Sequence, residues 1–385
     1  MIDATISTKP RHKQVVLPTG TLNLTIEHGP DIDELCAFAA RANPKRGFLI
    51  VSKVLGRHIP ARPAAMRAAM DALAASISAE VPQPVVFLGM AETATALGQG
   101  VFAAYQARNP DVACLYLQTS RQKVAGLTPI ATFEEGHSHA TSHLVQVEDP
   151  AMLDFIAKAR TLIVVDDECS TGNTFISAAE GMLGLMPNIE QVDTCCITDW
   201  SGGKYLAGMP RPAHAHSVLS GSMTWEPNPD AVAPQLAAGS NGAGNAPETG
   251  MRSRCGLWQP EAAIRPPVEC QPGYRVLVLG DGEHSYEALR IAEEVEAQGG
   301  IAAVQSITRT PAIVGHAMRT RSEFKDAYGS TAPTFLYNML EHDPYRVIIA
   351  AEIEAGQVHD AHAALAKLGA SLQVELTLCR YSRAA

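Results

Sequence analysis

Two adjacent carboxylates, Asp166 and Asp167, directly follow an apolar run and precede a loop of small and hydroxyl-bearing residues. The run Thr161–Val165 is rich in β-branched residues, which favours a parallel strand covered on both faces. Neighbouring carboxylates repel each other, so a pair at a strand end indicates that they hold hydroxyl groups or a divalent cation. The alternative is an acidic pair that only caps a helix.

The loop after the acidic pair has the composition of a phosphate site. Small side chains leave backbone N–H groups accessible at the start of the following helix, where the helix dipole also favours an anion. The loop residues are Glu168, Cys169, Ser170, Thr171, Gly172, Asn173 and Thr174. Strand, carboxylates and loop together predict a site for a sugar phosphate.

A second strand-to-helix turn is suited to another phosphate group. Gly89 permits close backbone approach, Thr93 supplies a hydroxyl, and the intervening Ala91 and Glu92 lie at the expected start of a helix. A plain helix start is the alternative.

Cationic residues follow a further expected strand, Gly47–Ser52. Lys53, Arg57 and His58 are candidates to neutralise diphosphate oxygens, and a basic surface turn is the alternative.

The segment from Gln118 to His143 is longer than an ordinary connection, and such loops are typically functional lids. Arg121 and Lys123 are candidates to bring positive charge to a leaving group. His137 and His139 are candidate phosphate donors or acids near neutral pH. The spacing of these histidines with His143 leaves a zinc site open as an alternative.

Strand and helix signals alternate along most of the chain, which predicts an α/β fold with a mostly parallel, twisted sheet flanked by helices. In such sheets the carboxyl ends of the strands meet at one edge, so the motifs above are expected to converge. Expected strands include Pro84–Leu88, Ala113–Gln118, Leu144–Val147 and Gln191–Thr198, and expected helices include Ala61–Ser78, Glu92–Ala107 and Pro150–Lys158.

An Ala-, Gly- and Pro-rich stretch divides the chain. We expect a first domain over 15–228, a flexible linker over 229–268 and a smaller α/β domain over 269–385. In the smaller domain, strands are expected at Tyr274–Leu279, Ile301–Gln305, Arg346–Ala350 and Leu372–Leu378, with helices near 285–298 and 361–368.

Composition narrows the class of protein. The 385 residues carry a formal net charge of -10, which argues against nucleic acid as the bulk partner. No stretch reaches the roughly 18 consecutive apolar residues of a membrane span. Eight scattered cysteines and an N-terminus without an apolar signal core favour a reducing cytoplasm.

The acidic-pair segment resembles the phosphoribosyl diphosphate (PRPP) motif of type I phosphoribosyltransferases. That resemblance implies that Asp166 and Asp167 hold the ribose hydroxyls with Mg²⁺, that Glu168–Thr174 wrap the 5-phosphate, and that Gly89–Thr93 form the pyrophosphate loop. Glu168 departs from the pattern, because an apolar residue is frequent at its position.

The whole chain resembles the orotate-phosphoribosyltransferase-like family of tellurite-resistance and stress gene clusters. Members carry a C-terminal domain named for a Thr-Arg-Ser-Pro motif, and Thr308-Arg309-Thr310-Pro311 occupies its place here, with Gly280–Glu283 and Phe335–Asn338 similar to other parts of that domain. Gly280, Gly282, Thr308 and Arg309 form a candidate anion site there, and a structural turn is the alternative.

The sequence thus predicts a magnesium-dependent transferase that joins ribose 5-phosphate from PRPP to a base-like nitrogen nucleophile, for a nucleoside-like metabolite. A PRPP- or nucleotide-sensing protein without catalysis is the alternative, and a C-terminal domain that processes the product is a third hypothesis. Expected partners are small molecules, with a homodimer allowed and neither nucleic acid nor membrane.

Overall fold

The computed structural model describes residues 10–41, 43, 46–133, 142–231, 244–246, 252–259, 263–264, 268–352, 359–367, 372–378 and 380–381. The larger sheet has a parallel centre in the order β13-β12-β10-β5-β6. The apolar, almost fully buried β10 lies at its middle, as its composition predicts. These strands are β5 (Val85–Gly89), β6 (Cys114–Ser120), β10 (Thr161–Val165), β12 (Gln191–Asp199) and β13 (Ala213–Pro227).

Antiparallel strands extend the sheet at both sides. The long β13 runs parallel to β12 in its first half and antiparallel to β2 in its second, with an irregularity between Ser220 and Gly221. The antiparallel strands are β1 (Arg11–Leu17), β2 (Gly20–His28), β8 (Ala131–Phe133) and β9 (His143–Val145). The short β11 (Glu168–Cys169) pairs parallel with β12.

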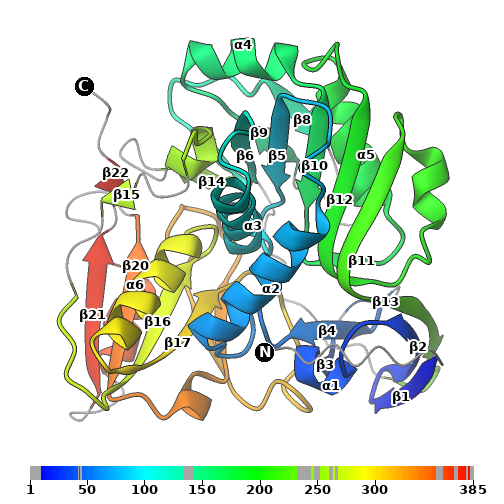
Figure 1. Cartoon of the computed structure of the whole chain (residues 1–385). Coiled ribbons are helices and arrows are strands. Elements are labelled where there is room, and N and C mark those ends of the chain that lie inside the picture. The colour runs from blue at the N-terminus through cyan, green and yellow to red at the C-terminus, as the bar shows by residue number, and fades with distance from the viewer. Residues whose placement is uncertain are drawn as a thin grey trace.

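Helices cover both faces of this sheet (Figure 1). α2 (Pro63–Ser76) and α3 (Thr95–Arg108) lie together on one face, and α5 (Asn173–Leu183) follows β10 on the other. α4 (Pro150–Lys158) precedes β10. A separate hairpin of β3 (Cys36–Ala40) and β4 (Phe48–Ser52) follows the short α1 (Ile32–Leu35).

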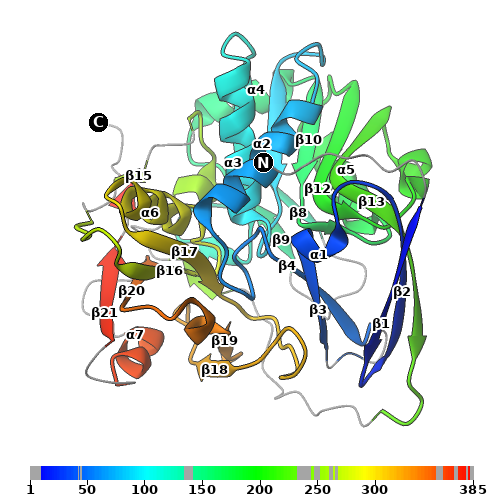
Figure 2. The same cartoon turned by 60° about the horizontal axis from the view of Figure 1, so that its bottom comes forward.

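The C-terminal domain has its own parallel sheet in the order β17-β16-β20-β21. Alternate residues of these strands pack with α6 in one core cluster and with α7 in another, so the two helices cover opposite faces (Figure 2). The elements are β16 (Arg275–Asp281), α6 (Tyr286–Ala297), β17 (Ile301–Ile307), β18 (Arg321–Phe324), β19 (Thr334–Tyr337), η3 (Met339–His342), β20 (Arg346–Ala351), α7 (Asp360–Leu365) and β21 (Gln373–Leu378).

Both sheets follow the same winding order. In each, the second strand lies on one side of the first and the third lies on the other: β6-β5-β10-β12 and β17-β16-β20-β21. Ligands of doubly wound sheets bind at the carboxyl edge where the winding reverses. In the larger sheet that place lies between β5 and β10, directly before Asp166.

The two domains share one apolar core. α6 packs against α2 and α3, and its buried residues belong to the same cluster as the larger sheet. Backbone hydrogen bonds also pair Ala61 with Val304 across the domain boundary, at 2.8 and 2.9 Å.

Part of the predicted linker is packed rather than free. β14 (Gly244–Ala246) pairs with β7 (Gln122–Val124), and Leu257 forms a β-bridge with Tyr116. η2 (Arg252–Cys255) carries Arg254, which is 0% exposed. The sequence did not predict these contacts, because this stretch has little apolar periodicity. β15 (Ala263–Ile264) pairs with β22 (Arg380–Tyr381) near the chain end.

The predicted α/β class, with a mostly parallel central sheet and a smaller C-terminal α/β domain, is confirmed. The helix start next to the predicted site differs from the prediction: α3 starts at Thr95, and Glu92 and Thr93 lie in the preceding turn. In the described part of the chain no helix has the length and apolarity that crossing a membrane requires.

Candidate active site

The acidic pair and the second glycine loop lie side by side at the carboxyl edge of the sheet. β10 and β5 are parallel, with Val165 in register with Gly89, and Met90 N donates to Val165 O at 2.9 Å. Asp166 N donates to Cys195 O of β12 at 2.9 Å. The ladder therefore fixes where both loops leave the sheet, and both Asp166 and Asp167 stay partly exposed beyond it.

Glu168 has a partner that the sequence did not reveal. The guanidinium of Arg46 lies 2.5 Å from its carboxylate, and the Arg46 guanidinium also lies over the Phe48 ring, 4.8 Å from its centroid. The third carboxylate next to the predicted phosphate loop is therefore neutralised by a residue from before β4.

Asp167 carries an altered proton affinity. Burial, and next the negative charge of Glu168, raise the pKa of Asp167 from 3.8 to about 6, against opposing effects of hydrogen bonds and of Arg46. Ionisation of Asp167 is thus less favourable than in water, as expected for a carboxylate that a cation or hydroxyl donors would stabilise.

The loop after the pair is shaped by Gly172. Its φ of 81° is left-handed, and an added Cβ would overlap the ring of Tyr205. α5 begins directly after it, at Asn173, and Ile176 N donates to Gly172 O at 3.0 Å. Only glycine therefore fits this turn without steric overlap.

The other loop residues differ in accessibility. Thr171 and Asn173 are exposed, Ser170 and Thr174 are partly exposed, and Cys169 is buried. Burial and the nearby Asp199 carboxylate raise the pKa of the Cys169 thiol above its usual range. Its side chain is therefore neutral, and the hydroxyls and backbone amides are the groups of this loop that are able to donate to a phosphate.

The pyrophosphate-loop candidate is tightly built. Gly89 packs against the Tyr116 hydroxyl, and a Cβ on Gly98 would lie 2.7 Å from Gly89 Cα. The Ala91–Glu92 peptide bond is cis. Ala91 N donates to Thr119 Oγ1 at 2.7 Å, which anchors the loop to the end of β6. Thr93 is partly exposed beside it.

The three cationic candidates after β4 have different surroundings. Lys53 Nζ donates to the Asp33 carbonyl at 2.5 Å. Arg57 is 3% exposed, forms an ion pair with Glu92, and donates to Gly282 O of the C-terminal domain at 2.7 Å. Burial lowers the pKa of Arg57 to about 10, so it stays charged at neutral pH.

His58 lies inside the domain boundary, 5% exposed, with Gln305 donating to its carbonyl at 3.1 Å. Burial, and then the charge of Arg57, lower the pKa of His58 to about 3. Its imidazole is therefore neutral at physiological pH and brings no positive charge, and the predicted role against a diphosphate stays a prediction.

The predicted lid is described only at its two ends. His137 and His139 lie outside the described residues. Arg121, 8% exposed, follows β6, and Lys123 is exposed on β7. His143 is fully buried against Phe133, with its Nδ1 2.9 Å from Thr119 Oγ1. Within the described residues, no three His, Cys, Asp or Glu side chains are grouped to hold a metal.

The groups of the predicted second anion site are engaged inside the protein. The Arg309 guanidinium donates to Asp326 at 2.8 Å, Gly282 N donates to Ile307 O at 3.1 Å, and Thr310 N donates to Thr308 Oγ1 at 3.1 Å. Gly280 packs against the start of α6, where a Cβ would lie 2.6 Å from His284 O. The anion site stays a prediction.

Comparison with known proteins identifies both parts of the chain. A family model described as phosphoribosyl transferase matches residues 35–221. A model described as the TRSP domain C-terminal to that transferase domain matches residues 260–368. No curated protein matches the chain.

Solved structures similar to the chain include adenine phosphoribosyltransferases. The enzyme from Rhodothermus marinus shows 16% identity and a TM-score of 0.34 over 49% of this chain and 96% of that one. The enzyme from Trypanosoma brucei, in complex with AMP, pyrophosphate and ribose-5-phosphate, shows 12% identity and a TM-score of 0.34 over 54% and 86%. The enzyme from Giardia lamblia shows 16% identity and a TM-score of 0.31 over 49% and 95%.

The family matches fall on the segments whose motifs carried the resemblance: the acidic pair and glycine loop in the first, and Thr308–Pro311 in the second. The chain therefore belongs to a family of phosphoribosyltransferases in which the transferase domain is followed by a TRSP domain.

Proposed function

We propose that the protein transfers the 5-phosphoribosyl group of PRPP to a base-like nitrogen nucleophile in the cytoplasm, and that the product is a nucleoside-like metabolite of a stress or tellurite-resistance pathway. The observation that carries the proposal is the pairing of Val165 with Gly89, which brings the acidic pair next to the cis Ala91–Glu92 turn. In this proposal, a ribose held by the loop after β10 has its C1 atom beside the loop after β5.

The residues present fit a Mg²⁺ ion brought with PRPP. Asp166 and Asp167 are partly exposed carboxylates at the strand ends, while Glu168 is neutralised by Arg46. The raised pKa of Asp167 indicates a carboxylate that is short of positive charge. When bound, Mg²⁺ would supply charge to the diphosphate oxygens.

The proposed roles follow from position. Asp166 and Asp167 hold the ribose hydroxyls, and the amides and hydroxyls of Ser170–Thr174 bind the 5-phosphate. Gly89–Thr93 bind the diphosphate, and Arg121 and Lys123 bring positive charge to it. The bond from C1 to the diphosphate oxygen breaks as the C1–N bond forms, and held charges stabilise the oxocarbenium-like state.

Product detection tests this proposal. The protein is incubated with PRPP, Mg²⁺ and a panel of nitrogen bases, and mass spectrometry searches for a base that has gained a phosphoribosyl group. We expect such an adduct with at least one base for the wild type and none for Asp166→Asn/Asp167→Asn. Tight PRPP binding by calorimetry without any adduct would instead favour a sensing protein.

A further inference from the structure

The C-terminal domain touches the transferase site at the ends of its strands. Segments that follow β4, β5 and β6 each contact a residue that follows β16 or β17. Because β5, β6, β16 and β17 lie in the parallel parts of their sheets, their carboxyl ends mark the edges where ligands bind. The carboxyl edges of the two domains therefore face each other.

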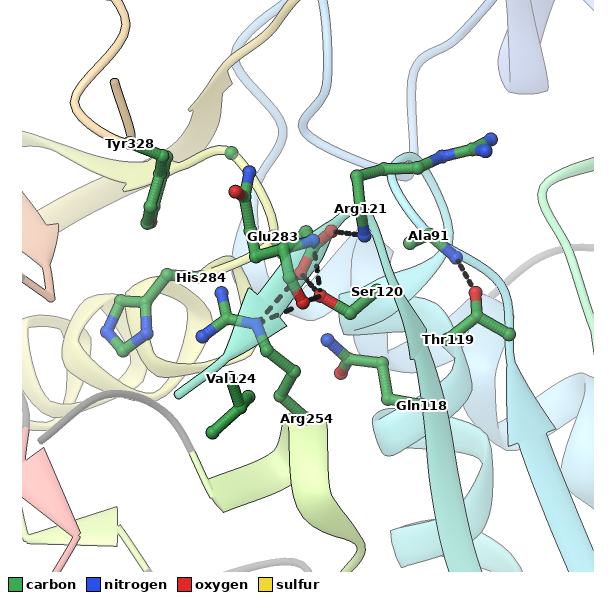
Figure 3. A network of polar contacts seen from close by, with 12 residues as sticks. Ala91, Gln118, Thr119, Ser120, Arg121, Val124, Arg254, Glu283, His284 and Tyr328 are labelled. Carbon is green, nitrogen blue, oxygen red and sulfur yellow. Dashed lines mark hydrogen bonds and ion pairs between the residues drawn. The ribbon is translucent and has the colours of Figure 1, made fainter. Parts of the chain in front are cut away.

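Glu283, after β16, holds the end of β6. Its buried carboxylate accepts hydrogen bonds from Ser120 Oγ at 2.7 Å and from the backbone N–H of Arg121 (Figure 3). Arg254 Nε donates to the same carboxylate at 3.1 Å. In Figure 3 the Arg121 side chain extends away from Glu283, on the side of the loop that carries Ala91.

The pyrophosphate-loop candidate is held from the same domain. Arg57 bridges Glu92, by an ion pair, and the Gly282 carbonyl, at 2.7 Å. The backbone N–H of Arg309 donates to the Glu92 carboxylate at 3.4 Å. Through Arg57, and directly from Arg309, the C-terminal domain thus holds Glu92 of the loop that follows β5.

These contacts involve charged side chains that are almost completely buried from solvent. Arg57 and Glu283 are each 3% exposed and Arg254 is 0% exposed. Hydrogen bonds to charged groups under such conditions are strong and directional. Three donors converge on Glu283, so its position is fixed by the transferase domain and the linker together.

We propose that the C-terminal domain completes the diphosphate end of the transferase site, with Glu283 as the positioning residue that sets the Ser120–Arg121 backbone. This inference rests on the proposed function. It assigns the domain a role in holding the leaving group, while the ribose 5-phosphate end depends on the larger domain alone.

The same domain boundary offers a matched control. Glu293 of α6 forms an ion pair with Arg67 of α2, with 2.5 Å between its carboxylate and Arg67 Nε, and this pair joins the domains along the helices rather than at the strand ends. Losing it removes an interdomain contact without touching either loop.

The experiment compares Glu283→Gln with Glu293→Gln in the full chain. An amide has one acceptor oxygen, so in either orientation its NH₂ group faces a donor, Arg121 N–H or Arg254 Nε. Calorimetry with Mg²⁺ measures the affinities for pyrophosphate and for ribose 5-phosphate, and thermal melting follows stability.

We expect E283Q to weaken pyrophosphate binding on the order of tenfold or more, as loss of one charged hydrogen bond implies. Its affinity for ribose 5-phosphate should match the wild type, and E293Q should change neither affinity. Glu283→Asp keeps the charge opposite Arg254 but is too short to reach every donor, so it should show the same split if E283Q does not fold.

The inference is overturned if both Glu283 variants weaken the binding of pyrophosphate and of ribose 5-phosphate by the same factor. It is also overturned if both variants keep the two wild-type affinities, as E293Q is expected to do. Wild-type protein that binds ribose 5-phosphate but not pyrophosphate also overturns it, and leaves the sugar site intact. Wild-type protein that binds neither ligand overturns both this inference and the proposed function.

Discussion

The carboxylate of Glu168 lies 2.5 Å from the guanidinium of Arg46, although 122 residues separate them in sequence. This pair sets the charge around Asp167. Glu168 raises the pKa of Asp167 and Arg46 lowers it, so the two partners act in opposite directions on one site carboxylate. The extra charge after the acidic pair therefore acts on the proton affinity of Asp167.

Removing the charge of either partner should change the lowest pH at which the protein binds ribose 5-phosphate. Glu168→Gln removes a negative neighbour, so we expect the pKa of Asp167 to fall below about 6 and binding to persist to lower pH. Arg46→Gln should shift the limit to higher pH. Calorimetry of ribose 5-phosphate with Mg²⁺ across pH measures both. Shifts in the same direction for the two variants would contradict the account.

Asp167→Asn should stabilise the protein while it abolishes transfer. The folded-state pKa of about 6 exceeds the ordinary 3.8, so the folded protein binds more protons than the unfolded chain between these values. Stability contributed by this group is present at low pH and is lost as pH rises through about 6. We expect a gain of about 1–3 kcal/mol at neutral pH from urea unfolding.

The control for Asp167→Asn is to compare its free energy of unfolding with that of the wild type at a second, lower pH. Near pH 4 the wild-type carboxyl is already mostly protonated in the fold, so the advantage of D167N should disappear there. An advantage that is equal at both pH values would mean that burial of charge is not its cause.

His58 should make the protein sensitive to acid. Its folded-state pKa of about 3 lies below the ordinary 6.5, so the unfolded chain binds the proton first, and stability falls as pH drops below about 6.5. Between about pH 7.5 and 5 this amounts to about 2 kcal/mol. His58→Phe, which keeps a ring near Tyr337, should not show this loss in urea unfolding.

The same substitution at exposed His28 serves as the control. We expect H28F to keep the acid sensitivity of the wild type. Equal sensitivity in H58F and H28F would rule out His58 as its source.

Gly172→Ala should damage the phosphate end selectively. The new methyl group meets the Tyr205 ring, and the left-handed φ of 81° adds backbone strain. We expect a stability loss of about 1–3 kcal/mol and weaker ribose 5-phosphate binding. Gly184→Ala, at the other end of α5 with open space around its position, is the control and should bind normally. Normal binding by G172A would show that the turn is not needed.

Local pattern was sufficient for the elements that carry the motifs. β10 matches the expected strand residue for residue, because a β-branched run bounded by charges has one plausible conformation. The start of α3 was less predictable, since Glu92, Thr93 and Ala94 were expected in the helix but lie in the turn before it.

Contacts between distant segments were not predictable. Arg46 is one of several basic residues in a turn-rich stretch, and nothing in its neighbours points to Glu168. Arg254 lies in a stretch whose composition indicates a linker, yet it is fully buried between Glu283 and Glu352. A buried charged residue can be recognised only when the positions of its partners are known, and this requires the three-dimensional fold.

Release of pyrophosphate from PRPP tests the central claim most directly. Wild-type protein and Asp166→Asn/Asp167→Asn are each given PRPP, Mg²⁺ and a panel of bases, and pyrophosphate is measured over time. The account predicts base-dependent release by the wild type and loss of that release in the variant. No release with any base, or equal release by both proteins, would contradict it.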